Sequence, residues 1–134
     1  MKFVDLKVGL KGFVTKTITE TDVILYSGVS LDVNPAHLNQ VYAEGSMFKK
    51  RIVHGMLSSG LISAVLGTKL PGEGTIYLEQ TLKFKAPVFF GDTITATAEI
   101  TELIPEKNRV KLSTICTNQD GKEVISGTAT VLKE

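Results

Sequence analysis

The residues best suited to chemistry lie in segment 32–37, which reads DVNPAH. Asn34 is a favoured helix N-cap and Pro35 a favoured first helical residue, so the spacing predicts a helix that begins at Pro35. His37 then lies in the first turn and Asp32 on the extended approach to it, which lets both side chains turn into one cleft. A carboxylate and a neutral imidazole can hold a water molecule between them and exchange protons with it.

The same segment also has an ordinary explanation. Asp-x-Asn-Pro is common turn chemistry, so Asp32 and Asn34 can be turn and cap residues only, with His37 an exposed helix residue. If the site is functional, free N–H groups at the helix start favour an ionised Asp32 and a neutral His37. The spacing alone leaves both interpretations open.

A second candidate lies in segment 51–56, RIVHGM. An extended apolar approach leads to Gly55 at the start of an apolar helix, where unpaired N–H groups can bind an anion or an oxyanion. Glycine allows close approach of a ligand, although it can also merely avoid a steric clash. His54 is interpreted as a structural histidine.

Helices are predicted in the first half of the chain and strands in the second. Helices are expected at 19–30, near Pro35 and at 55–69, where apolar side chains nearly all round the helix predict complete burial. Strands are expected at 12–19, 75–85, 92–104, 109–118 and 123–132, separated by turn signals. The pattern predicts an α+β fold in which an antiparallel sheet curls over the long helix.

The composition is that of a globular chain of 134 residues, 43% of them hydrophobic. This length predicts a single domain spanning residues 1–134. Fifteen Lys+Arg against fourteen Asp+Glu lack the basic excess typical of nucleic-acid or membrane binding, so neither partner is expected. The single cysteine, Cys116, allows no intramolecular disulfide, favours a cytoplasmic location and is expected in the core.

Taken in order along the chain, segments 32–37, 51–56 and 82–92 resemble the MaoC-like hydratase family of the hot-dog fold. The similarity is greatest to the single-domain (R)-specific enoyl-CoA hydratases. It implies a long central helix wrapped by a five- or six-stranded antiparallel sheet, and a homodimer. The implied reaction is reversible addition of water to a trans-2-enoyl-CoA, giving (R)-3-hydroxyacyl-CoA without a metal or redox cofactor. Short acyl chains are expected to react best if Leu66 and Val131 close the far end of the acyl pocket.

The resemblance assigns roles by position. Asp32 and His37 match the family's catalytic pair, and the Gly55 amide matches its oxyanion hole. The positions expected to bind substrate are Asn34, Ser63, Leu66 and Val131.

Two other functions stay open: a hot-dog thioesterase acting on the same thioester, and a non-catalytic acyl-CoA-binding module. The intact Asp32 and His37 argue against both. The basic residues near these segments could meet the CoA phosphates or be solvated surface charge. They are Lys49, Lys50, Arg51, Lys83 and Lys85.

Overall fold

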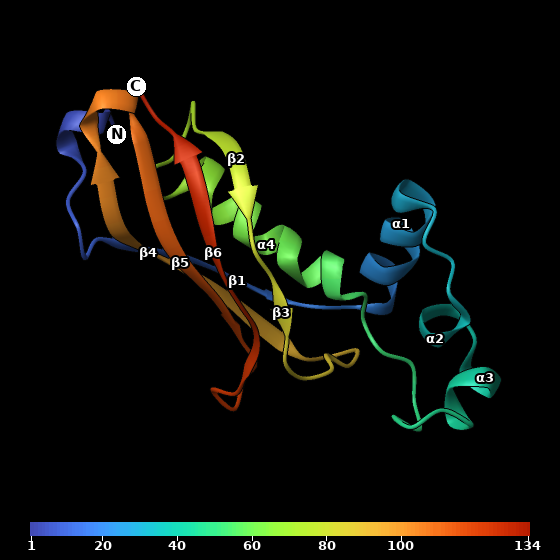
Figure 1. Cartoon of the computed structure of the whole chain (residues 1–134). Coiled ribbons are helices and arrows are strands. Elements are labelled where there is room, and N and C mark those ends of the chain that lie inside the picture. Colours follow the sequence, from blue (N-terminus) through green and yellow to red (C-terminus); the bar gives the residue numbers. More distant parts are fainter.

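The computed structural model describes all of residues 1–134. After a first strand, helices fill the rest of the first half of the chain and strands the second half, as predicted (Figure 1). The elements are β1 (Lys11–Thr17), α1 (Glu20–Ser30), α2 (Pro35–Leu38), α3 (Gln40–Glu44), α4 (Gly55–Thr68), β2 (Ile76–Gln80), β3 (Lys83–Phe84), β4 (Thr93–Ile104), β5 (Arg109–Thr117) and β6 (Glu123–Leu132), with 3-10 turns at Phe3–Asp5 and Pro105–Lys107.

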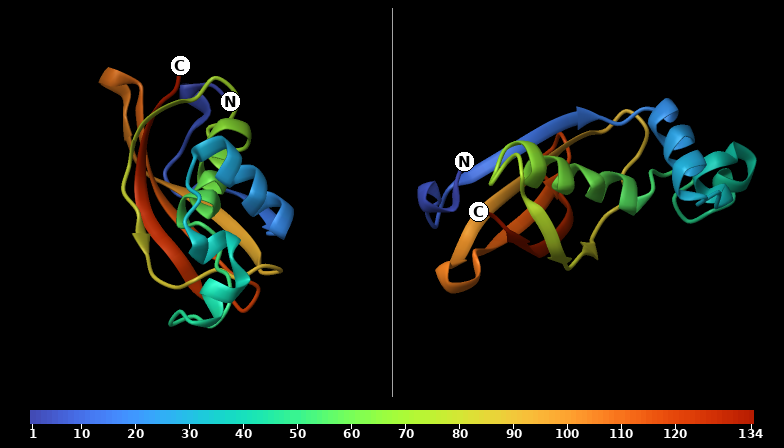
Figure 2. Two further views of the ribbon diagram at one scale, coloured as in Figure 1. Left: turned by 90° about the vertical axis from the view of Figure 1, so that its right-hand side faces the viewer. Right: turned by 90° about the horizontal axis from the view of Figure 1, so that it is seen from above.

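One antiparallel sheet of six strands forms the body of the molecule. Its order is β1-β4-β5-β6-β2, and β3 also pairs with β6. The sheet curves around α4, which lies across its concave face (Figure 2). This confirms the expected α+β fold with a long helix wrapped by a sheet.

The core lies between α4 and the sheet. Alternate residues of β4 are buried from Ile94 to Ile100, as expected for a strand with one face toward a helix. Ile62, Val65 and Leu66 supply the matching face of α4. None of the helices combines the length and the apolar character that crossing a membrane requires.

The prediction that α4 is buried all round is wrong for this chain. Met56, Gly60, Ser63 and Gly67 are exposed. Their spacing of three and four residues places them on one side of the helix, as an exposed stripe of mostly small side chains. The small residues had been expected to fill gaps against the sheet, but the side of α4 that packs into the core against the sheet is the opposite one.

The strand expected at 75–85 is two strands, β2 and β3, separated by Thr81 and Leu82. A β-bulge between Tyr77 and Glu79 shifts the register of β2 on β6. The Thr81 carbonyl then lies so close to Gly127 that a Cβ atom there would be 1.8 Å from its oxygen. The break therefore requires a glycine in β6.

Helices α1, α2 and α3 form a helical lobe beyond the first residue of α4, at the opposite end from the two termini (Figures 1 and 2).

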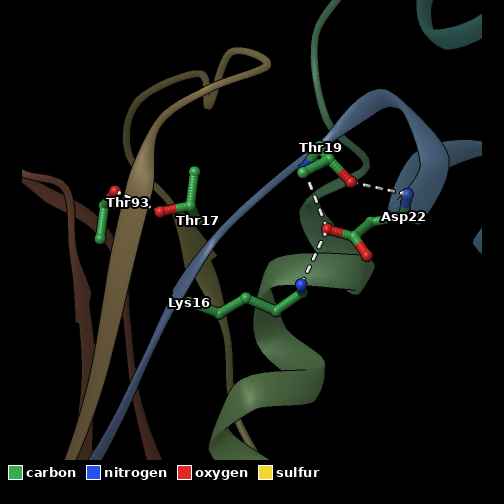
Figure 3. Close-up of polar contacts among 5 residues, drawn as sticks. All are labelled: Lys16, Thr17, Thr19, Asp22 and Thr93. Carbon is green, nitrogen blue, oxygen red and sulfur yellow. Dashed lines mark hydrogen bonds and ion pairs between the residues drawn. The ribbon is translucent and has the colours of Figure 1, made fainter.

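A capping box stabilises the start of α1, the first helix of this lobe. The Thr19 hydroxyl accepts from the Asp22 N–H at 3.2 Å, and the Thr19 N–H donates to the Asp22 carboxylate at 2.9 Å (Figure 3). Lys16 Nζ lies 3.1 Å from the same carboxylate. The backbone hydrogen bond from Thr19, above all, lowers the pKa of Asp22.

Candidate active site

Helix α2 begins as the sequence predicts. The Asn34 side chain accepts a hydrogen bond from the Ala36 N–H at 3.0 Å, and Pro35 is the first helical residue. The Asp32 carboxylate accepts from the Asn34 N–H at 3.3 Å. The structure therefore gives Asn34 a capping role. Its predicted contact with substrate stays a prediction.

His37 is buried, with 8% of its surface exposed, so it is not the exposed helix residue of the ordinary interpretation. Its Nδ1 atom lies 2.7 Å from the Ile52 carbonyl oxygen. Because a carbonyl oxygen can only accept, Nδ1 carries the proton of the neutral ring. The Nε2 atom is left with a lone pair, which is the form that a general base requires.

Asp32, His37 and Gly55 line one cavity of about 460 Å³. Its apolar walls include Phe48, Phe84, Pro87 and Ile125. An oxygen of the Asp32 carboxylate and a ring nitrogen of His37 lie within 4.8 Å of each other. A single water molecule making hydrogen bonds of about 2.8 Å can bridge two atoms at that separation. The structure thus brings the three predicted catalytic residues together.

Gly55 is the first residue of α4 and exposes its backbone to this cavity. The N–H groups of Leu57 and Ser58 both donate to the His54 carbonyl, at 3.1 and 3.3 Å. The N–H groups of Gly55 and Met56 have no such partner, so they can donate to a ligand.

Gly55 also has a packing role. A Cβ atom at this position would lie 2.6 Å from the Phe84 ring. Both interpretations of this glycine, avoidance of a clash and a free N–H group in the site, therefore agree with the structure.

His54 contacts both members of the predicted pair, which the sequence did not indicate. It is 2% exposed, and its Nε2 atom lies 3.0 Å from the Asp32 carbonyl oxygen and 3.1 Å from Ser27 Oγ. Its ring stacks on His37 with a centroid distance of 3.8 Å. Burial, above all, lowers the pKa of His54, and the nearby His37 adds to this effect. The signal in the sequence was a histidine next to the helix-starting Gly55.

Asp32, His37 and His54 are also the one group of side chains close enough to share a metal ion, within 4.8 Å. The two imidazole rings are stacked with their planes inclined by only 30°, so their in-plane lone pairs lie in nearly parallel, separate planes. Ligands of one ion must converge on it. The geometry favours a hydrogen-bonded cluster, and the expectation that no metal or redox cofactor takes part stays a prediction.

The structure does not bring Ser63, expected to line the active site, or Leu66 and Val131, expected to line the acyl pocket, to this cavity. Leu66 and Val131 are at most 1% exposed and belong to the core between α4 and the sheet. Ser63 lies on the exposed side of α4, in a separate hollow of about 410 Å³ that Tyr77 and Gln80 also line. The contact of these three residues with substrate stays a prediction.

The basic residues considered for binding the CoA phosphates differ in what they contact. Lys85 lines the cavity and forms an ion pair with Glu123 at 2.8 Å. Lys50 lies over the Phe89 ring at 4.1 Å, and Arg51 forms an ion pair with the first residue of α1. Of the five basic residues, Lys85 is the one that lines the cavity.

Comparisons with known proteins agree with this geometry. The MaoC like domain family model matches residues 7–131. An (R)-specific enoyl-CoA hydratase of Rhodospirillum rubrum is 57% identical, over 97% of this chain and 90% of the relative. A 3-hydroxybutyryl-CoA dehydratase of Methylorubrum extorquens is 46% identical, over 92% of this chain and 77% of the relative.

A solved structure gives the same result for the fold. The unliganded R-hydratase PhaJ1 from Pseudomonas aeruginosa superimposes with a TM-score of 0.94 at 48% identity, over 98% of this chain and 84% of that one. The family match covers nearly the whole chain, and the six-stranded sheet around α4 is that of the hot-dog hydratases. This chain therefore belongs to the MaoC-like domain family.

Proposed function

We propose that this protein is an (R)-specific enoyl-CoA hydratase that adds water reversibly to short-chain trans-2-enoyl-CoA. One observation carries the proposal: the Asp32 carboxylate, the His37 ring and the first residue of α4, Gly55, line the same cavity. The names of two relatives, an (R)-specific enoyl-CoA hydratase and a 3-hydroxybutyryl-CoA dehydratase, support CoA thioesters of 3-hydroxy acids as the substrate class.

The reaction follows from the three groups. A water molecule held between the Asp32 carboxylate and His37 Nε2 forms a bond from its oxygen to C3 of the enoyl group. The π electrons of the C2–C3 bond move toward the thioester carbonyl, whose oxygen gains negative charge that the Gly55 N–H can stabilise. The pair removes one proton from the water and delivers one to C2. Addition from one face gives the (R)-alcohol, and the reverse steps remove water.

The hydrogen bond from His37 Nδ1 to the Ile52 carbonyl supports this division of work, because it fixes the tautomer and the ring orientation. His37 Nε2 can accept a proton without any rearrangement of the ring. The thioester itself delocalises the developing charge, so the proposed reaction uses neither a metal nor a redox cofactor.

We also propose a homodimer. Strand β2 is an edge of the sheet, and its Ile76, Tyr77 and Leu78 are each at least 37% exposed. An exposed edge with apolar side chains is a template for pairing with another chain. The exposed stripe on α4 faces the same hollow as β2. Light scattering at micromolar concentration tests the proposal, and a monomeric mass would contradict it.

The decisive assay is the loss of crotonyl-CoA absorbance with purified protein, followed by chiral analysis of the product. Asp32→Asn and His37→Gln should each reduce kcat by at least ~10² while the protein stays folded, because general acid–base groups contribute about that much. Asp120→Asn, in the exposed turn before β6, is the matched control and should leave kcat unchanged. Release of free thiol in place of hydration would identify a thioesterase, and the hydratase proposal would then be wrong.

A further inference from the structure

His54 contacts both members of the proposed catalytic pair from a different segment of the chain. Its Nε2 atom is 3.0 Å from the Asp32 carbonyl oxygen, and its ring stacks on His37 at a centroid distance of 3.8 Å. It is also the N-cap of α4, directly before Gly55. Its side chain makes no capping hydrogen bond, which leaves it available for these contacts.

We propose that His54 is a positioning residue for hydration, which fixes the Asp32 main chain relative to His37 and to the first N–H groups of α4. The proposal rests on the function proposed above. His54 is 2% exposed and acts through Asp32, so we assign it no contact with the reacting atoms.

The hydrogen bond to Asp32 matters because the segment before α2 has few other restraints. Asp32 is exposed, and the preceding Leu31 has a left-handed backbone with φ of 66°. Within its own turn, the Asp32 N–H donates to the Ser30 hydroxyl and the Asp32 carboxylate accepts from the Asn34 N–H. Outside that turn, His54 is the hydrogen-bonding partner of the Asp32 main chain. Loss of this bond would free the carboxylate to move away from His37.

The surroundings of His54 require one neutral tautomer. Its Nε2 atom faces the Asp32 carbonyl, which can only accept, so Nε2 carries the proton. Its Nδ1 atom is buried without a hydrogen-bond partner. A proton on Nδ1 would be a buried donor with no acceptor, which is costly. The ring therefore stacks on His37 as an uncharged, fixed surface.

Two substitutions separate the hydrogen bond from the stacked ring. The amide nitrogen of Gln can occupy the place of Nε2, so His54→Gln keeps the bond to Asp32 and loses the ring. His54→Phe keeps the ring and loses the bond. For crotonyl-CoA hydration we expect kcat to fall about 10- to 100-fold in His54→Phe, with KM within about threefold of wild type, since displacement of a catalytic group by about 1 Å costs up to ~10². We expect His54→Gln to stay within about fivefold of wild type.

A double-mutant cycle distinguishes positioning from general stabilisation. If His54 acts through the Asp32 carboxylate, His54→Phe should lower kcat by less than about threefold once Asp32 is already Asn. A purely structural effect would instead reduce kcat by the same factor in both backgrounds. That result would overturn the proposal. So would a His54→Phe enzyme with more than about a third of wild-type kcat, or a His54→Gln enzyme as impaired as His54→Phe.

A measurement on the unmodified protein covers the case in which His54→Phe does not fold. The chain has only two histidines, so nitrogen NMR of ¹⁵N-histidine protein gives two ring systems. At pH 7 we expect one ring with its proton on Nε2, assigned to His54, and one with its proton on Nδ1, assigned to His37. A charged His54 ring, or one protonated on Nδ1, would overturn the proposal. Absence of hydration by wild-type protein would refute the proposed function, whereas the NMR result would still decide the hydrogen bond.

Discussion

Replacement of Gly55 by Ala should both destabilise the protein and impair hydration. An added Cβ would lie 2.6 Å from two carbons of the Phe84 ring. Carbon atoms in ordinary contact are about 3.5–4.0 Å apart, so the ring or the first turn of α4 must move by about 1 Å. Overpacking of this kind costs roughly 1–3 kcal/mol.

The ring is the part that should yield. Phe84 is 54% exposed and lies in the two-residue strand β3, whereas α4 is packed along the sheet. We therefore expect a loss at the lower end of that range, about 1 kcal/mol in the free energy of unfolding. Phe84 also lines the cavity, so its displacement next to the Gly55 N–H should lower kcat/KM for crotonyl-CoA about 10- to 100-fold.

Gly28→Ala is the matched control, because this glycine also lies within a helix, α1, and a Cβ there meets nothing within 4 Å. It should stabilise the protein by roughly 0.4–1 kcal/mol and leave kcat/KM unchanged. Chemical denaturation of both variants, and of Gly55→Ala combined with Phe84→Ala, measures the effect. In the double variant the added methyl should cost nothing further. Equal stability of Gly55→Ala and wild type, with full activity, would refute the reasoning.

Three other changes follow from buried or capping groups. Asp22→Asn should destabilise the protein at pH 7, and progressively less as the pH falls below 3.8. The folded state lowers the pKa of Asp22, so the stabilisation by its carboxylate is complete above pH 3.8 and is lost as the pH falls through the lowered pKa. Denaturation at several pH values measures this, and a difference in unfolding free energy that did not change with pH would contradict it. Cys116 should not react with a thiol reagent at pH 8 until the protein unfolds. The residue is 0% exposed, and burial raises the pKa of its thiol to about 11. Rapid labelling of the native protein would contradict this. Leu66→Ala should cost about 2–5 kcal/mol in unfolding free energy, as expected for a fully buried leucine. A rise in kcat/KM for octenoyl-CoA relative to crotonyl-CoA in this variant would show that Leu66 also limits the acyl pocket, and an unchanged ratio would withdraw that role.

Local signals in the sequence predicted much of the fold. Asn34 and Pro35 marked the start of α2 because a cap and a first helical residue act within one turn. Strand β6 was predicted with its observed bounds, Glu123–Leu132. The break between β2 and β3 could not be predicted, because it depends on the contact between Thr81 and Gly127, which are far apart in the chain.

For the candidate site too, the sequence predicted the features that depend on local signals and missed those that depend on tertiary packing. The spacing of Asp32 and His37 allowed the common cavity that the structure shows, because both flank one helix start, but it did not distinguish this from an exposed His37. The contacts of His54 depend on how α1 packs against the beginning of α4, and no local pattern encodes that packing. The burial of Leu66 and Val131 likewise depends on how the sheet closes over α4.

The placement of Asp32 and His37 on the helical lobe has a thermal consequence. The lobe lies beyond the sheet. Few hydrogen bonds and ion pairs join it to the segment before α4: those of His54 with Ser27 and Asp32, two between α2 and Ile52, and the ion pair of Arg51 with Glu20. Small units held by few buried contacts open locally at a lower free energy than the whole protein. On warming, amide hydrogens of α1 and α2 should therefore exchange before those of β4 and β5. Activity should disappear several degrees below the temperature at which the sheet melts, and a bound substrate should close that gap.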